Sequence, residues 1–277
     1  MPDPIPPTIT FLTDYGLADA FVGICHGVIA TICPAARVID LHHGIPRHDV
    51  RAGAIVLADA LPYLPVGVHL AVVDPDVGAE RRAVALALAD GRTLVGPDNG
   101  LLMPAAEQSG GVLAAADIAR STFRLKPVSA TFHGRDIFAP VAAALANGVP
   151  VAEVGDPLDP AELVRLEMPV AQMRDGVLVA HVRYVDGFGN LQLDAGHEDL
   201  AGTGLKLGRA VLIALDHEPG DGADAQAQYA RTFADVARGE LLLYEDAGRR
   251  LAVAVSHGDA AQRLGAGVGD ALRIRPQ

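Results

Sequence analysis

Residues 67–74, GVHLAVVD, decide the fold of the N-terminal part of this chain. This run is apolar, has the length of a buried strand and stops at an acid, Asp74. Similar short apolar runs occur in TITFL (8–12) and RVIDL (37–41). Apolar residues recur at helical spacing in the segments between these runs. The resulting β-α-β-α-β order predicts a largely parallel sheet covered by helices.

The character of the sequence changes near residue 173. MRDGVLVAHVRYVDGFGNLQL (173–193) has an Asp-Gly turn followed by β-rich alternation, and further short strands follow it. The chain is therefore predicted to have an α/β fold with two domains. Residues 1–172 form an α/β domain, and residues 173–277 form a smaller antiparallel β-barrel. Residues 218–229 are expected to form an exposed loop.

The composition of the chain limits the classes of partner that it could bind. The 277 residues carry 22 Lys and Arg against 34 Asp and Glu, a net charge of −12. This balance disfavours nucleic acid and anionic membranes. There is no transmembrane-length apolar run or signal peptide, so we expect a cytoplasmic protein. Cys25 and Cys33 are expected to be reduced core residues.

Polar residues follow several of the predicted strands. If those strands are parallel, the polar residues meet at one edge of the sheet, where α/β folds bind ligands. Several acids at one edge need a ligand or basic partners. The residues concerned are Asp14, Asp40, Asp74, Asp98 and Asn99.

A carboxylate, a guanidinium and an imidazole form the candidate catalytic set. Asp74 has Arg81 and Arg82 as possible partners in VVDPDVGAERRAV, and His133 lies in ATFHGRDIFAP. Asp74, Arg81 and His133 together could position and polarise a water molecule. The alternatives are a surface ion pair and a structural histidine. The adjacent Arg-Asp pair is expected to brace the loop or cap the following helix.

Missing motifs exclude several kinds of chemistry. No phosphate-binding glycine loop and no serine nucleophile elbow is present. His42, His43 and His48 lack the spacing of a zinc site on a helix, so neither a metal nor another cofactor is expected. A ligand held by carboxylates at strand ends is expected to offer hydroxyls, amines or a positive charge.

Six blocks in register resemble one family. TFLTDYGLADAFVG, VVDPDVGAERRAV, VGPDNGLL, TFHGRDIFAP, DGFGN and TFADVARGELLLYE follow the order seen in the S-adenosyl-L-methionine (SAM) hydroxide adenosyltransferases. These SAM hydrolases are relatives of the fluorinases and chlorinases. The resemblance implies cleavage of SAM by water into adenosine and methionine. It also implies a homotrimer with active sites between subunits.

The same resemblance assigns roles to individual residues. Asp74, Arg81 and His133 align with an Asp-Arg-His triad assigned to water. The implied substrate contacts are Asp14 to the ribose hydroxyls, Asp19 and Asp186 near the methionine ammonium, Asn190 to the adenine edge, Phe188 and Phe233 beside the base, and also Asn99 and Tyr244.

Departures from the family pattern bear on specificity. Gly134 and Val77 stand where the fluorinase has a Ser and a Thr, so halide chemistry is disfavoured. His48 stands where the fluorinase has a Trp against the nucleoside. Asp246-Ala247 replaces a common Asn-Ser pair, and Asp246 would repel a methionine carboxylate.

Three other functions remain open from the sequence. The first is a metal-dependent phosphoesterase that uses Asp14, Asp74 and Asp76, because Asp-Pro-Asp after an apolar strand can bind Mg²⁺. The second is a non-catalytic module that binds SAM or adenosine. The third is a halogenase.

Overall fold

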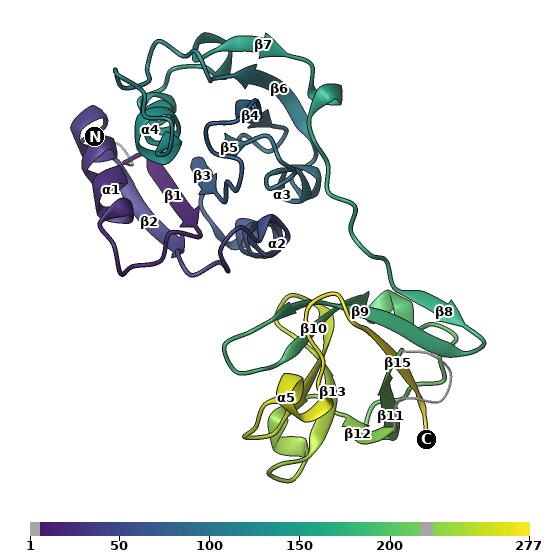
Figure 1. The fold of residues 1–277 in the computed structure, drawn as a ribbon. Coiled ribbons are helices and arrows are strands. Elements are labelled where there is room, and N and C mark those ends of the chain that lie inside the picture. The colour runs from purple at the N-terminus through teal and green to yellow at the C-terminus, as the bar shows by residue number, and fades with distance from the viewer. Residues whose placement is uncertain (1–5, 217–223) are drawn as a thin grey trace, which may run out of the picture. The chain divides into compact units, whose positions relative to one another are not determined.

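The computed structural model describes residues 6–216 and 224–277. The chain divides into two compact units, Met1–Leu166 and Glu167–Gln277, which are described separately below. Within these described residues, the first unit contains a sheet and four α-helices, and the second contains a barrel (Figure 1).

The sheet of the first unit has seven strands in the order β2-β1-β3-β5-β4-β6-β7. Parallel pairing joins β2, β1, β3 and β5, whereas β4, β6 and β7 are added by antiparallel pairing. The predicted parallel sheet is thus the half of a mixed sheet that carries the acids at its strand ends. The strands are β1 (Thr8–Thr13), β2 (Arg37–His42), β3 (Val68–Val72), β4 (Ala83–Leu88), β5 (Thr93–Pro97), β6 (Val112–Asp117) and β7 (Asp156–Leu158).

The helices of this unit pack in pairs, α1 with α4 and α2 with α3 (Figure 1). They are α1 (Phe21–Ile32), α2 (Val50–Ala60), α3 (Met103–Gln108) and α4 (Ala139–Ala146). The α1–α4 pair covers one face of the sheet, with the fully buried rings of Phe11 and Phe138 between the layers. Cys25 and Cys33 are buried free thiols in this core, and burial raises the pKa of Cys25 to about 12. No helix of the described chain has the length and apolar character needed to span a membrane.

The second unit is a closed barrel. The strand order β10-β14-β13-β12-β11-β15-β9 returns to β10 through a β10–β9 pairing, and β8 extends β9 outside the ring. All pairs are antiparallel except β12–β13. Its elements are β8 (Gln172–Arg174), β9 (Val177–Val185), β10 (Leu191–Gly196), β11 (Ala210–Leu215), β12 (Ala225–Tyr229), β13 (Leu241–Glu245), β14 (Arg250–Val255), α5 (Ala260–Leu264) and β15 (Ala271–Pro276).

The turn at the start of the barrel follows the sequence prediction. Asp175 and Gly176 have φ angles of 51° and 79° between the paired residues Arg174 and Val177. Two consecutive positive φ angles make the two-residue hairpin turn that Asp-Gly favours.

One predicted loop is wrong in part. Within 218–229, residues Ala225–Tyr229 form the barrel strand β12, because Ala227 and Tyr229 point into the core while the chain pairs with β11 and β13. Residues 218–223 of that predicted loop lie outside the described residues.

Candidate active site

The parallel half of the sheet brings the predicted polar residues to one edge. Asp14 directly follows β1, Asp74 lies two residues beyond β3, and Asp98 directly follows β5. Because these strands are mutually parallel, their carboxyl ends face the same way. The prediction of a shared edge is therefore confirmed for these three acids, whereas Asp40 lies inside β2 (Arg37–His42), where it pairs with Phe11 of β1. The side chains at the edge divide into two groups.

The first group is the Asp74–Arg81–His133 chain of hydrogen bonds. The Arg81 guanidinium donates through Nε to Asp74 Oδ1 at 2.8 Å and through Nη2 to Asp74 Oδ2. The same Nη2 lies 2.9 Å from His133 Nδ1. The side chains of Asp74 and Arg81 are only 4% and 9% exposed, so their pairing is desolvated, unlike a surface ion pair.

This geometry sets the tautomer of His133. A guanidinium can only donate hydrogen bonds, so Nδ1 of His133 is the acceptor and the neutral ring carries its proton on Nε2. Burial and the positive charge of Arg81 lower the pKa of His133, against the opposing influence of Asp74 and Asp136. The imidazole is therefore neutral at neutral pH.

The packing around the triad keeps it in place. The Arg81 guanidinium lies 5.3 Å from the centroid of the Phe138 ring. Asp136 accepts a hydrogen bond from Ser129 N at 2.7 Å and two from the Arg135 side chain. The adjacent Arg135-Asp136 pair thus braces the loop that carries His133, as the sequence predicts.

A cavity of about 170 Å³ opens beside the triad. It is lined by Asp14, Tyr15, Phe21, Asp74, Val77, Thr131, Phe132, His133 and Gly134. Asp14 accepts a 2.9 Å hydrogen bond from the backbone N of His48, a residue held at a φ of 67°. Sequence reasoning missed Tyr15, Phe21 and Thr131, although all three lie beside predicted site residues or in the quoted motifs.

Tyr15 fills the space in front of Gly134. A Cβ atom built on Gly134 would lie 2.1 Å from the Tyr15 hydroxyl oxygen, far inside van der Waals contact. Burial raises the pKa of this phenol well above its usual value, and nearby negative groups, including Asp14 and Asp74, add to the effect. Tyr15 is therefore a neutral hydroxyl group at the cavity, and residue 134 has no room for a side chain.

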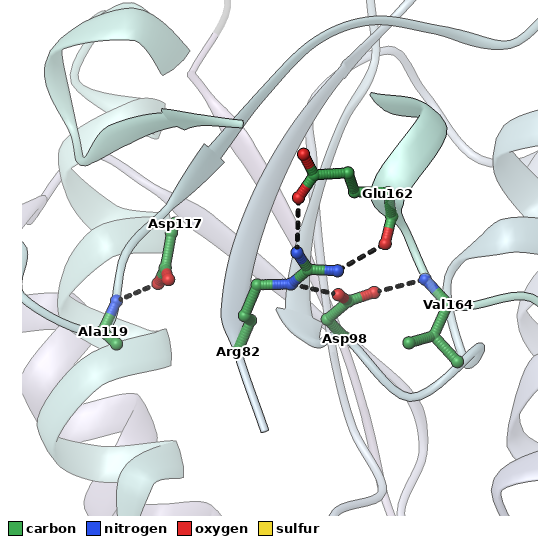
Figure 2. A network of polar contacts seen from close by, with 6 residues as sticks. All are labelled: Arg82, Asp98, Asp117, Ala119, Glu162 and Val164. Carbon is green, nitrogen blue, oxygen red and sulfur yellow. Dashed lines mark hydrogen bonds and ion pairs between the residues drawn. The ribbon is translucent and has the colours of Figure 1, made fainter. Parts of the chain in front are cut away.

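The second group of edge residues is engaged in structural contacts. Asp98 accepts from Arg82 Nε at 2.7 Å and from Val164 N at 2.9 Å, while Arg82 also contacts Glu162. Figure 2 shows this network, with Arg82 between Asp98 and Glu162. Of the two arginines that the sequence offers to Asp74, only Arg81 contacts it.

Three other predicted residues do not line the cavity. Asn99 Nδ2 donates to Val73 O at 2.9 Å, and Asn99 Oδ1 accepts from Leu101 N at 3.2 Å. Both polar atoms of its side-chain amide are therefore hydrogen-bonded to the backbone. Asp19 is exposed outside the cavity lining. Asp76 is exposed as well and does not line the cavity that Asp14 and Asp74 share. This arrangement gives no support to a metal site formed by Asp14, Asp74 and Asp76.

The predicted nucleoside residues gather in the barrel. A cavity of about 830 Å³ in the second unit is lined by Asp186, Phe188, Asn190, Phe233, Tyr244, Val255, His257, Gly258, Asp259 and Gln262. All five sequence-predicted residues of this unit are in that set. Sequence reasoning missed His257, Asp259 and Gln262, which follow β14 and carry no recognisable motif.

Hydrogen bonds shape the DGFGN loop in this cavity. Asp186 accepts from the backbone N of Phe188 at 2.8 Å and of Asn190 at 3.0 Å, and from Asn190 Nδ2 at 2.8 Å. Phe188 is 80% exposed, and the ring of Phe233 lies 5.1 Å from that of Tyr244. The arrangement presents aromatic rings beside an amide, as a site for a flat heterocycle requires.

Asp246 has a structural role close to this cavity. Its Oδ1 accepts from Gly248 N at 2.8 Å and from Arg250 N at 3.0 Å, which closes the turn between β13 and β14. Burial, together with Asp186 and Asp246, raises the pKa of Tyr244 to about 12. The Tyr244 hydroxyl is therefore a neutral donor or acceptor beside the acids.

Comparisons with known proteins show which family the chain resembles. The SAM hydroxide adenosyltransferase N-terminal domain matches residues 9–155, and the C-terminal domain of the same family matches residues 180–273. An "(R)-S-adenosyl-L-methionine hydrolase" from Salinispora tropica is 51% identical over 269 residues, covering 97% of both chains. A "Fluorinase" from an Actinoplanes species is 29% identical over 76% of this chain and 78% of its own.

A solved structure agrees as well. The crystal structure of an uncharacterized conserved protein from Thermotoga maritima is 35% identical, with a TM-score of 0.89 over 96% of this chain and 99% of that one. The two matched domains cover more than half of the sequence between them. The chain therefore belongs to the SAM hydroxide adenosyltransferase family.

Proposed function

We propose that this enzyme hydrolyses SAM to adenosine and L-methionine by in-line attack of water at ribose C5′. The water oxygen forms a bond to C5′ while the C5′–S bond breaks, and the electron pair of that bond stays on sulfur. The sulfonium leaves as the neutral thioether of methionine, so no acid is needed to protonate it. One proton of the water remains on the new 5′-hydroxyl, and the other passes to a base.

One observation carries this proposal: a desolvated Asp74–Arg81–His133 chain beside a small cavity that Asp14 also lines. Asp14 is suited to accept hydrogen bonds from ribose hydroxyls, because a carboxylate accepts two such bonds readily. Positioning a water molecule behind C5′ can lower the barrier by up to about 7–11 kcal/mol.

Asp74 is the better proton acceptor of the three triad residues. His133 Nδ1 already accepts from Arg81, and its Nε2 carries a proton, so the neutral ring has no lone pair left for water. Each oxygen of Asp74 keeps a second lone pair after binding Arg81. We therefore assign proton acceptance to Asp74 and orientation of the water to His133 and Arg81.

The barrel cavity is proposed to bind the nucleoside and the ammonium group. Asn190 would read the adenine edge, with Phe188 and Phe233 against the base and Tyr244 beside them. Asp186 would attract the ammonium group of methionine. Asp19 and Asn99 remain predicted substrate contacts on the family resemblance alone.

Water is favoured over halide as the nucleophile. Neither Gly134 nor Val77 offers a hydroxyl group to a halide ion, and the Tyr15 hydroxyl occupies the space where any side chain at position 134 would begin. The buried Asp74 carboxylate would also repel an anion at this cavity.

The first test is a chromatographic time course of the purified protein with each sulfonium epimer of SAM, with and without EDTA. We expect adenosine and methionine in equal amounts, no loss of activity in EDTA at temperatures where the protein stays folded, and no dependence on halide. His133→Ala should lose activity, whereas His197→Ala, which changes an exposed histidine, should retain it. SAM that binds but stays intact would favour a binding module instead.

A second comparison separates orientation from proton transfer. In His133→Asn the amide oxygen can still accept from Arg81, but the side chain has no basic nitrogen. If His133 orients the water, this variant should retain more activity than His133→Ala. Equal loss in both variants would instead support His133 as the base.

The homotrimer with active sites between subunits is also proposed, since the family resemblance implies it. Light scattering should then give a mass of about 86 kDa, three times the 28.7 kDa chain. Co-expressed His133→Ala and Asn190→Ala chains should recover part of the activity, because some sites would combine two intact halves. Two inactive chains that stay inactive together would argue against shared sites.

A further inference from the structure

Two histidines and an aspartate meet on the first unit, outside the candidate active site. His26 comes from α1, Asp40 from β2, and His43 directly follows β2. His26 Nε2 and His43 Nε2 lie 2.7 and 3.0 Å from Asp40 Oδ1. Among the residues that the structure describes, these three form the one group with three possible metal-ligand atoms within 4.8 Å of one another. We call this group the His26–Asp40–His43 cluster.

The ring of His43 is oriented as in a metal site. Its side chain is only 4% exposed, and Nε2 is a buried atom that makes no hydrogen bond, although it points at Asp40. The other ring nitrogen, Nδ1, lies 2.9 Å from the Thr13 hydroxyl. Histidine ligands of metals usually have such a polar partner behind the ring, which fixes the tautomer.

The surroundings of the cluster also suit a cation. The fully buried ring of Phe11 packs against both histidines, at 4.9 Å from His43 and 6.0 Å from His26. The side chains of His26 and Asp40 are 34% and 47% exposed, so an ion can reach the cluster from solvent.

We propose that His26, Asp40 and His43 bind a divalent transition-metal ion of the Zn²⁺ type, with water in the remaining position. Two imidazoles and one carboxylate are a common ligand set for such ions. Ligand atoms around a tetrahedral ion with usual bond lengths of about 2.0 Å lie about 3.3 Å apart. The three side chains would therefore need to move apart only slightly to hold the ion.

The metal is assigned a structural role. His43 O accepts from Gly16 N at 2.7 Å, and the Thr13 hydroxyl accepts from Tyr15 N at 3.2 Å. A metal at Nε2 fixes a proton on Nδ1 of His43, which then donates to Thr13. The ion would thereby hold the turn that carries Asp14 and Tyr15, without taking part in the reaction at C5′.

The test measures metal binding and thermal stability. EDTA-treated, desalted protein is dialysed against Zn²⁺, and its melting temperature is compared with and without the ion. We expect one bound Zn²⁺ per chain and a higher melting temperature. Co²⁺ in place of Zn²⁺ should give the visible absorption of a site with nitrogen and oxygen ligands.

Three variants locate the site. His26→Lys keeps a cation beside Asp40 but cannot ligate Zn²⁺ through an imidazole, so affinity should fall at least about tenfold and the thermal shift should disappear. Asp40→Asn should act similarly. His42→Ala, which changes the neighbouring histidine outside the cluster, should bind Zn²⁺ as the wild type does.

Two results would overturn the proposal. One is the absence of stoichiometric Zn²⁺ binding by the wild type. The other is binding that His26→Lys and Asp40→Asn leave unchanged, which would mean that other histidines hold the ion. Because the readouts are bound metal and melting temperature, they are independent of the proposed SAM hydrolysis.

Discussion

At the scale of single residues, Arg81 controls the protonation of the candidate triad. It donates to Asp74 and to His133 from the same nitrogen, so the two partners share one guanidinium. A positive charge beside an imidazole disfavours a second positive charge there. The protonation state of His133 therefore depends directly on the position of Arg81.

The first prediction concerns the pKa of His133. In the wild type, NMR titration should show the Nε2–H tautomer and a pKa below 6.5, the ordinary value for histidine. Arg81→Met should raise this pKa, because the positive charge is removed while Asp136 still favours protonation.

The lowered pKa of His133 also predicts how the reaction rate depends on pH. In the proposed mechanism His133 acts in its neutral form, so its lowered pKa predicts that activity does not fall as pH drops from 8 to 6.5. It should decline only at lower pH, as the ring becomes protonated. Loss of activity already between pH 8 and 7 would mean that another group limits the rate.

The second prediction concerns Gly134. Gly134→Ala would place a methyl group 2.1 Å from the Tyr15 hydroxyl, so we expect a loss of about 1–3 kcal/mol in unfolding free energy and a large loss of activity. Adding Tyr15→Phe should partly restore stability, because the next ring atom is 3.1 Å away. Thermal and urea unfolding measure both effects.

The matched control for this substitution is Gly23→Ala. Gly23 lies in α1 with no atom within 4 Å of an added Cβ. Removing a helix-interior glycine should leave stability unchanged or raise it by up to about 1 kcal/mol. If Gly134→Ala behaves like Gly23→Ala, Tyr15 moves freely and does not restrict residue 134.

At the scale of elements, β1 and β3 are joined by a buried histidine. His69 of β3 is fully buried and pairs across the sheet with Thr10, whose hydroxyl lies 2.9 Å from His69 Nδ1. Burial, with a smaller effect of Arg92 and against that of Asp90, lowers the pKa of His69 to about 4.

The third prediction follows from that pKa. The unfolded chain binds a proton at His69 below pH 6.5, but the folded chain does so only near pH 4, so stability falls as the pH drops through this window. Between pH 7 and pH 5 the wild type should lose about 2 kcal/mol from this residue alone. His69→Gln should show a shallower dependence in urea unfolding, whatever its absolute stability. Equal slopes would show that folding does not lower the pKa of His69.

The elements also show what a single sequence can predict. The strands β1, β2 and β3 are apolar runs that end near acids, so their existence and the shared edge followed from the pattern. The direction of β4 did not, because its alternating Ala, Val and Leu are buried on both faces and carry no directional signal. The strand β12 was missed because Ala and Gln alternate weakly beside a Gly- and Asp-rich segment.

Side-chain partners were harder to predict than strands. The sequence offered Arg81 and Arg82 equally to Asp74, and only the fold turns Arg82 away to Asp98 and Glu162. The cluster at His43 was missed for the same reason, because His26 reaches Asp40 from the preceding helix, 14 residues earlier in the chain. Contacts between elements depend on packing, which periodicity does not encode.

At the scale of the whole molecule, charge should influence substrate binding. The chain carries a net charge of −12, whereas SAM carries a positive sulfonium and a positive ammonium against one carboxylate. A negative protein attracts a cationic ligand, and salt screens that attraction over a distance of about 10 Å at 0.1 M. Binding of SAM should therefore depend on ionic strength.

The fourth prediction is that kcat/KM for SAM falls severalfold when ionic strength rises from about 0.01 M to 0.5 M. The change should appear in KM, with kcat nearly constant, because the proposed chemistry uses the buried Asp74–Arg81 pair, which salt screens weakly. Inhibition by adenosine, which is neutral, should change far less and serves as the control. If SAM and adenosine respond equally, salt acts on the protein itself. If kcat falls and KM does not, the net negative charge of the protein does not contribute to SAM binding. The attraction then comes only from acids in direct contact with the substrate.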